Sequence, residues 1–87
     1  MEYPIYIKRN KYQRIMIINE SNYITVENYI DIFAIEYNEN HFGVERYTKK
    51  LKKKAIEISQ SEFLRFYHDA LIEINNRAFG VNDETAR

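Results

Sequence analysis

Few residues in this chain could carry out catalysis: two histidines and a small number of serines, with no cysteine. His41 and His68 lie far apart, and neither belongs to an H-x-x-x-H or H-x-x-E pair of the kind that binds metals. Ser59 and Ser61 stand at an expected helix start, where capping explains them, and Ser21 has no histidine nearby in the sequence. We therefore expect no nucleophilic active site and no metal site.

Two carboxylates on the expected C-terminal helix, Asp69 and Glu73, could form an acid–base pair. Each has an arginine four residues away, Arg65 for Asp69 and Arg77 for Glu73. This spacing predicts a ladder of surface ion pairs instead of a catalytic dyad. Both glycines are isolated, so no glycine-rich phosphate loop is present. We predict that the chain is not an enzyme and binds no cofactor.

Charge is segregated along the chain, although the formal net charge is zero. Two basic blocks, residues 8–14 and 46–54, enclose a stretch from 15 to 45 that has acidic residues but neither Lys nor Arg. Solvated loops and strand ends explain this pattern, and so does a dipolar surface that steers a charged partner. The candidate partner-binding residues are Lys8, Arg9, Lys11, Tyr12, Arg14, Glu36, Glu39, Arg46, Lys49, Lys50, Lys52, Lys53, Lys54, Leu64, Ile72 and Phe79.

Tyrosines accompany both basic blocks. Tyr6 and Tyr12 bracket Lys8, Arg9 and Lys11 of the first block, and Tyr47 precedes the lysines of the second. Aromatic platforms beside basic groups are typical of proteins that bind single-stranded nucleic acid. Tyrosines at alternate strand positions are also ordinary cross-strand packing pairs.

Residues 58–80 carry the clearest helix signal. Ser59 and Glu62 form a capping box, and Ile58 and Phe63 have the spacing of a hydrophobic staple. Gly80 suits the position after the helix end. The apolar residues repeat with helical spacing on one face: Phe63, Phe66, Tyr67, Ala70, Leu71, Ile74 and Ala78. We predict one amphipathic helix that covers a sheet.

A second apolar strip on this helix consists of Leu64, Ile72 and Phe79. A helix that covers a sheet needs only one apolar face, so this strip indicates contact with a partner. Scattered exposed apolar side chains are also normal on protein surfaces.

The sequence before the helix reads as short strands separated by polar turns. The expected strands are residues 3–8, 12–18, 23–27, 30–37, 42–47 and 55–58. The run 15–18 is apolar on both faces, which predicts a central strand covered on both sides or a strand at an interface. Residues 26–37 also fit a helix, but their β-branched and aromatic content favours strands. Val44, Tyr47, Leu51 and Ala55 would line a short helix in an alternative interpretation.

We therefore predict an α+β fold: a mainly antiparallel meander of about five short strands, followed by one long C-terminal helix. Residues 1–81 are expected to form one domain and residues 82–87 a flexible tail. The absence of cysteine, of a membrane-length apolar run and of a signal-peptide pattern predicts a cytoplasmic protein.

The function expected from these features is non-enzymatic protein binding. We predict an interaction module that inhibits or modulates a larger nucleic-acid-handling protein, with the acidic stretch facing a basic channel. Small, cysteine-free chains without catalytic groups are common among phage and mobile-element proteins, including inhibitors of defence nucleases. The alternatives are direct binding of RNA or single-stranded DNA through residues 8–14 and 46–54, and a structural homodimer.

Overall fold

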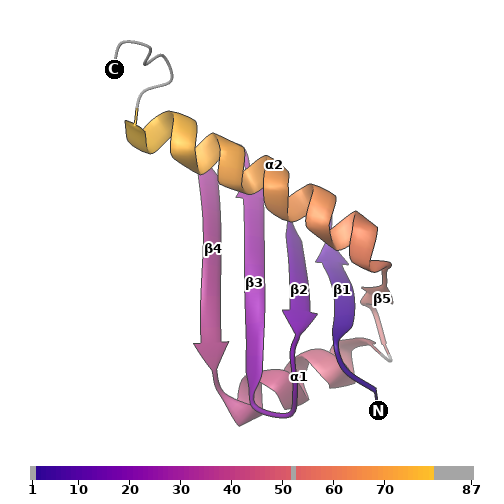
Figure 1. The fold of residues 1–87 in the computed structure, drawn as a ribbon. Helices are drawn as coiled ribbons and strands as arrows, with labels where there is room; N and C mark the ends of the chain where they lie inside the picture. Colours follow the sequence, from indigo (N-terminus) through magenta and orange to yellow (C-terminus); the bar gives the residue numbers. More distant parts are fainter. Residues whose placement is uncertain (1, 52, 80–87) are drawn as a thin grey trace.

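The computed structural model describes residues 2–51 and 53–79, which form a five-stranded antiparallel sheet between two helices (Figure 1). The elements are β1 (Ile5–Asn10), β2 (Gln13–Ile17), β3 (Asn22–Tyr29), β4 (Ile32–Glu39), α1 (His41–Leu51), β5 (Ile56–Glu57) and α2 (Gln60–Phe79). The strand order is β4-β3-β2-β1-β5, so β1 to β4 form a meander and β5 pairs with the outer side of β1. The predicted α+β fold, with a meander before a long helix, is confirmed.

The central strand β2 is apolar on both faces because both faces are covered. Met16 lies opposite Tyr6 and Ile24 in the ladder. Since side chains alternate along a strand, Ile15 and Ile17 point to the opposite side from Met16. Ile15 and Ile17 are fully buried in the core under α1, whereas Met16 packs against the core under α2. The expectation of a doubly covered central strand is therefore confirmed.

Residues 42–47, which we expected to form a strand, belong to helix α1, so this prediction is wrong. The Asn40 side chain caps α1, since its Oδ1 accepts hydrogen bonds from the backbone N–H groups of Phe42 and Gly43 at 3.0 and 3.2 Å. Val44 and Tyr47 are buried on the helix face that meets the sheet. Val44 and Tyr47 also have the spacing of one helix face, as in the alternative interpretation. In the folded chain this spacing outweighs their individual preference for strands.

Helix α2 begins as the sequence predicts. The Ser59 hydroxyl accepts a hydrogen bond from the N–H of Glu62 at 3.1 Å, and Ile58 packs against the same core as Phe63. Of the predicted apolar face, Phe63 and Ala70 are buried, most of the others are half-buried, and Ala78 is exposed. Gly80 and the tail 82–87 lie outside the described residues.

Residues 26–37 form strands joined by a tight turn, and no helix. Tyr29 pairs with Ile32, which leaves only Ile30 and Asp31 to form the turn. Ile30 has a φ of 49°, a left-handed conformation that is unusual for a β-branched residue. The strand interpretation of this segment is therefore confirmed.

Helices α1 and α2 cover opposite faces and opposite ends of the sheet (Figure 1). Helix α2 crosses the strands near the end that carries the β3–β4 turn, on the side facing the viewer. The sheet on that side is consequently left open at its other end.

Candidate binding surfaces

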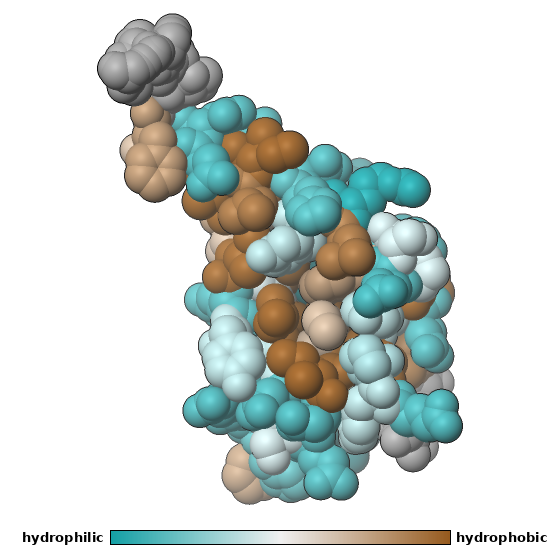
Figure 2. Space-filling model, in the orientation of Figure 1, coloured by the Kyte–Doolittle hydropathy of each residue, from teal (hydrophilic) through white to brown (hydrophobic). Residues whose placement is uncertain are grey.

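Part of the sheet on the α2 side is apolar and not covered by the helix. In Figure 2, apolar side chains gather below α2 and are flanked by hydrophilic ones. Met16, Ile24 and Ile35 are half-buried there, and Tyr37 is 57% exposed. Met16, Ile24 and Tyr37 are neighbours in one row across β2, β3 and β4. We call these four residues the open apolar surface.

The predicted second strip of α2 is exposed to solvent. Leu64, Ile72 and Phe79 have exposed fractions of 39%, 55% and 76%. They point away from the helix face that carries the buried Phe63 and Ala70. The helix therefore presents apolar groups beyond those that its own core uses.

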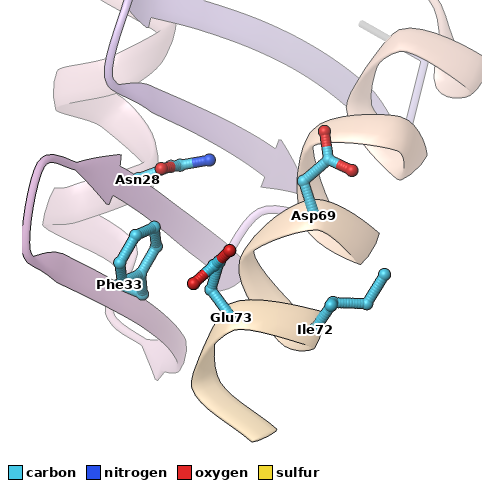
Figure 3. Close-up of a pocket in the computed structure, with 5 residues that line it drawn as sticks. All are labelled: Asn28, Phe33, Asp69, Ile72 and Glu73. Carbon is cyan, nitrogen blue, oxygen red and sulfur yellow. The ribbon is translucent and has the colours of Figure 1, made fainter. Parts of the chain in front are cut away.

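A hollow of about 290 Å³ lies between α2 and the β3–β4 hairpin (Figure 3). Its lining consists of Asn28, Phe33, Asp69, Ile72 and Glu73. In Figure 3 the Glu73 side chain extends from α2 toward Phe33 of β4, while Ile72 points away from the ring. We call this site the acidic hollow, because its two ionisable residues are both carboxylates.

Arg77 borders the acidic hollow. Its Nε lies 3.5 Å from Oε1 of Glu73, which confirms half of the predicted ladder, and its Nη1 lies 3.7 Å from Asp31. Its guanidinium carbon is 4.7 Å from the centre of the Phe33 ring. The other predicted pair, Arg65 with Asp69, is not formed in the described part of the chain. Asp69 therefore remains available to a ligand from outside.

The outer edge of β4 is acidic. Glu36 and Glu39 lie on this strand, which pairs only with β3 among the described residues. The Tyr37 hydroxyl donates a hydrogen bond to Oε2 of Glu39 at 3.2 Å. Local desolvation and this hydrogen bond both raise the pKa of the Tyr37 phenol. Glu39 lies beside Tyr37 on the α2 side, whereas the alternation along β4 places Glu36 on the α1 side near Tyr23, so the open apolar surface ends at the Glu39 carboxylate.

The first basic block does not act as a unit. Lys8 and Arg14 are ladder partners whose side chains face α2. The guanidinium of Arg14 stacks on Phe66, and burial lowers its pKa, an effect that Glu62 opposes. Lys11 lies in the β1–β2 turn, with its Nζ 5.4 Å from the centre of the Tyr12 ring. Arg14 is therefore a packing residue, which sequence alone did not reveal.

Arg9 joins the second basic block on the α1 side of the sheet. It lines a hollow of about 510 Å³ together with Asn10, Lys50, Lys53, Lys54 and Ala55. The Lys50 carbonyl accepts hydrogen bonds from the N–H groups of Lys53 and Lys54 at 3.0 and 2.9 Å, which turns the chain at the end of α1. We call this site the basic hollow. Arg46 and Lys49 are exposed elsewhere on α1, and Lys52 lies outside the described residues.

Two tyrosines lie beside the basic hollow. The rings of Tyr12 and Tyr29 meet edge to face with their centres 4.3 Å apart. They line a second hollow of about 370 Å³, to which Arg9, Asn10, Gln13 and Glu27 also contribute. Tyr29 was missed in the sequence because it reaches Tyr12 only through the pairing of β2 with β3.

The two histidines behave as surface residues. His41 lies 3.8 Å from Glu45 on α1, and both side chains are more than half exposed. His68 lies against Tyr67 on α2. Within residues 2–51 and 53–79, no group of three or more His, Cys, Asp or Glu side chains could hold a metal ion. No helix in that part is both long and apolar enough to cross a membrane.

No protein-family model, curated protein or solved structure shows significant similarity to this chain. The fold and its surface chemistry are therefore the basis for assigning a function.

Proposed function

We propose that the protein is a non-enzymatic binding module that docks on a larger nucleic-acid-handling protein and inhibits or modulates it, as an inhibitor of a defence nuclease would. The observation that supports this most is the open apolar surface, which continues onto exposed apolar residues of α2 and is bordered by the Glu39 carboxylate. Apolar patches with a charged rim are typical of protein contact sites.

The charges around this surface favour a basic partner. Glu39 of β4 lies next to Tyr37, and Asp69 and Glu73 line the acidic hollow. No Lys or Arg occurs between residues 15 and 45 to neutralise the hairpin. Proteins that handle nucleic acid bind phosphates in basic channels, which have the complementary charge.

The acidic hollow fits a lysine or arginine side chain of the partner. Phe33 would contact the aliphatic stem, and Asp69 and Glu73 would accept hydrogen bonds from its charged end. Arg77 offsets part of the negative charge, so Asp69 is the main group left to pair. A basic anchor at the hollow and apolar contact at the open surface would together orient the partner.

Affinity capture with matched variants tests this function. The immobilised protein is incubated with an extract of the cells that naturally contain it, and the retained proteins are identified by mass spectrometry. Tyr37→Ser with Ile72→Ser removes two exposed groups from the proposed contact area. Phe42→Ser with Ile56→Ser removes two groups of similar exposure on α1 and β5 as a control.

We expect a nucleic-acid-handling protein to be retained by the wild type and the control but not by the Tyr37/Ile72 variant. Equal retention by all three would contradict the proposal. Light scattering on the purified protein tests the other occupant of the surface, a second copy of the chain. A stable dimer that the Tyr37/Ile72 variant abolishes would favour the homodimer instead.

A further inference from the structure

We propose that the basic hollow and the neighbouring tyrosine pair bind single-stranded nucleic acid, with phosphates at the lysines and a base at the rings. This site lies on the α1 side of the sheet, whereas the open apolar surface lies on the α2 side. The inference is therefore independent of the proposed function.

The basic hollow gathers positive charge from segments that are distant in the sequence. Arg9 comes from the end of β1, and the three lysines come from the end of α1 and the turn that follows it. None of the four cations forms an ion pair with a carboxylate in the described part of the chain. Like charges so close together repel one another, and a bound polyanion relieves that repulsion.

A structural role explains only some of this charge. Lys50 is in the last turn of α1, where a cation interacts favourably with the helix dipole. Lys53 and Lys54 follow the helix and are exposed, and Arg9 lies across the hollow from them on β1. Arg9 donates one hydrogen bond to Gln13 at 2.8 Å, which positions the guanidinium between the two hollows.

The tyrosine pair makes the site selective for single strands. Tyr12 and Tyr29 are 37% and 39% exposed, so each offers an open edge or face. Gln13 and Glu27 beside them can hydrogen-bond the edge of a base. The Glu27 carboxylate repels phosphate, which assigns phosphates to the lysine side and bases to the tyrosine side. Bases stacked inside a duplex cannot reach these rings.

Fluorescence anisotropy with a labelled single-stranded DNA of about ten nucleotides tests the site. Titrations at salt concentrations between about 50 and 200 mM give the affinity and its salt slope. The same sequence as a duplex, and heparin as a competitor, distinguish single strands from other polyanions.

Three variants separate the parts of the site. Arg9→Gln with Lys53→Gln should weaken binding and reduce the salt slope by about 1.4, the value for two single-strand phosphate contacts. Tyr12→Ala should weaken binding about tenfold and leave the slope unchanged, because stacking releases no counterions. Lys8→Gln with Arg65→Gln removes the same charge from other surfaces and should change the affinity less than threefold.

The expected result is a preference for single strands that depends on the basic hollow and on the neighbouring hollow lined by Tyr12 and Tyr29. The proposal is overturned if no binding is detected, or if the Lys8/Arg65 control weakens binding as much as the Arg9/Lys53 variant. It is also overturned if the duplex or heparin binds as tightly as the single strand and Tyr12→Ala does not change the affinity for the single strand. Because these variants lie away from Tyr37 and Ile72, either proposal can fail while the other stands.

Discussion

The guanidinium carbon of Arg14 lies 4.1 Å from the centre of the Phe66 ring, so a cation of the first basic block is part of the contact between the sheet and α2. A guanidinium over an aromatic ring stabilises by about 1 kcal/mol when it is partly shielded from water. The apparent basic block is therefore divided between packing and surface charge.

Replacing Arg14 by glutamine should lower the free energy of unfolding by about 1 kcal/mol, because the cation–π contact with Phe66 is lost. Urea denaturation followed by circular dichroism measures the change. In a Phe66→Leu background the same replacement should cost much less. Equal losses in both backgrounds would show that Arg14 does not act through the ring.

Gly43 lies where α1 packs directly against the Tyr23 ring of the sheet. A Cβ at this position would lie 2.6 Å from Cε1 of Tyr23, so alanine cannot be accommodated unless the ring moves. Although alanine favours a helix by about 1 kcal/mol over glycine, overpacking costs about 1–3 kcal/mol. Gly43→Ala should therefore destabilise the wild type in urea melts and stabilise a Tyr23→Leu variant. A stabilised wild type would contradict this packing.

The β3–β4 turn is held at a conformational cost. Ile30 has a φ of 49°, and the left-handed region costs an ordinary residue about 1–2 kcal/mol. The side chain is exposed, so its removal loses little burial. Ile30→Asn should raise the midpoint of urea unfolding, since asparagine tolerates this conformation. A lower midpoint would show that the contacts of the isoleucine side chain stabilise the fold by more than its left-handed backbone conformation destabilises it.

Alkaline pH should destabilise the protein partly through Tyr23. Burial first, and then the neighbouring Tyr47, raise the pKa of the Tyr23 phenol above its ordinary value of 10.0. Above pH 10 the unfolded chain releases this proton while the folded chain retains it, so unfolding becomes more favourable. The contribution of Tyr23 to the free energy of unfolding is complete below pH 10. It falls as the pH rises through the pKa of the folded state, by up to about 1.4 kcal/mol per pH unit.

The Tyr23→Phe variant isolates that effect. We expect its free energy of unfolding to fall less steeply than that of the wild type as the pH rises above 10, because phenylalanine has no phenol proton to lose. Urea melts at a series of pH values measure both slopes. Identical slopes would exclude Tyr23 as a source of the alkaline loss.

The sequence predicts those parts of the fold that depend on neighbouring residues. The Ser59 cap, the apolar face around Phe63 and Ala70, and the alternation in β2 are all local patterns, and the structure confirms them. Residues 42–47 are predicted to form a strand because Val44 and Tyr47 favour strands, while Asn40, the cap of α1, resembles an ordinary turn residue.

The surfaces were harder to predict because they depend on pairing between distant segments. Arg9 meets Lys53 only after β1 pairs with β5, and Tyr12 meets Tyr29 only after β2 pairs with β3. The acidic hollow likewise combines Phe33 of β4 with carboxylates of α2. Charge segregation was visible in the sequence, but which charged side chains share one face of the sheet was not.

The most direct test of the proposed function is the activity of the captured partner in the presence of this protein. The purified partner is titrated with the wild type and with an Asp69→Lys/Glu73→Lys variant, and its action on nucleic acid is measured. We predict that the wild type changes this activity with saturation, and that charge reversal at the acidic hollow raises the required concentration at least tenfold. An activity that is unchanged at saturating wild-type protein would contradict the account.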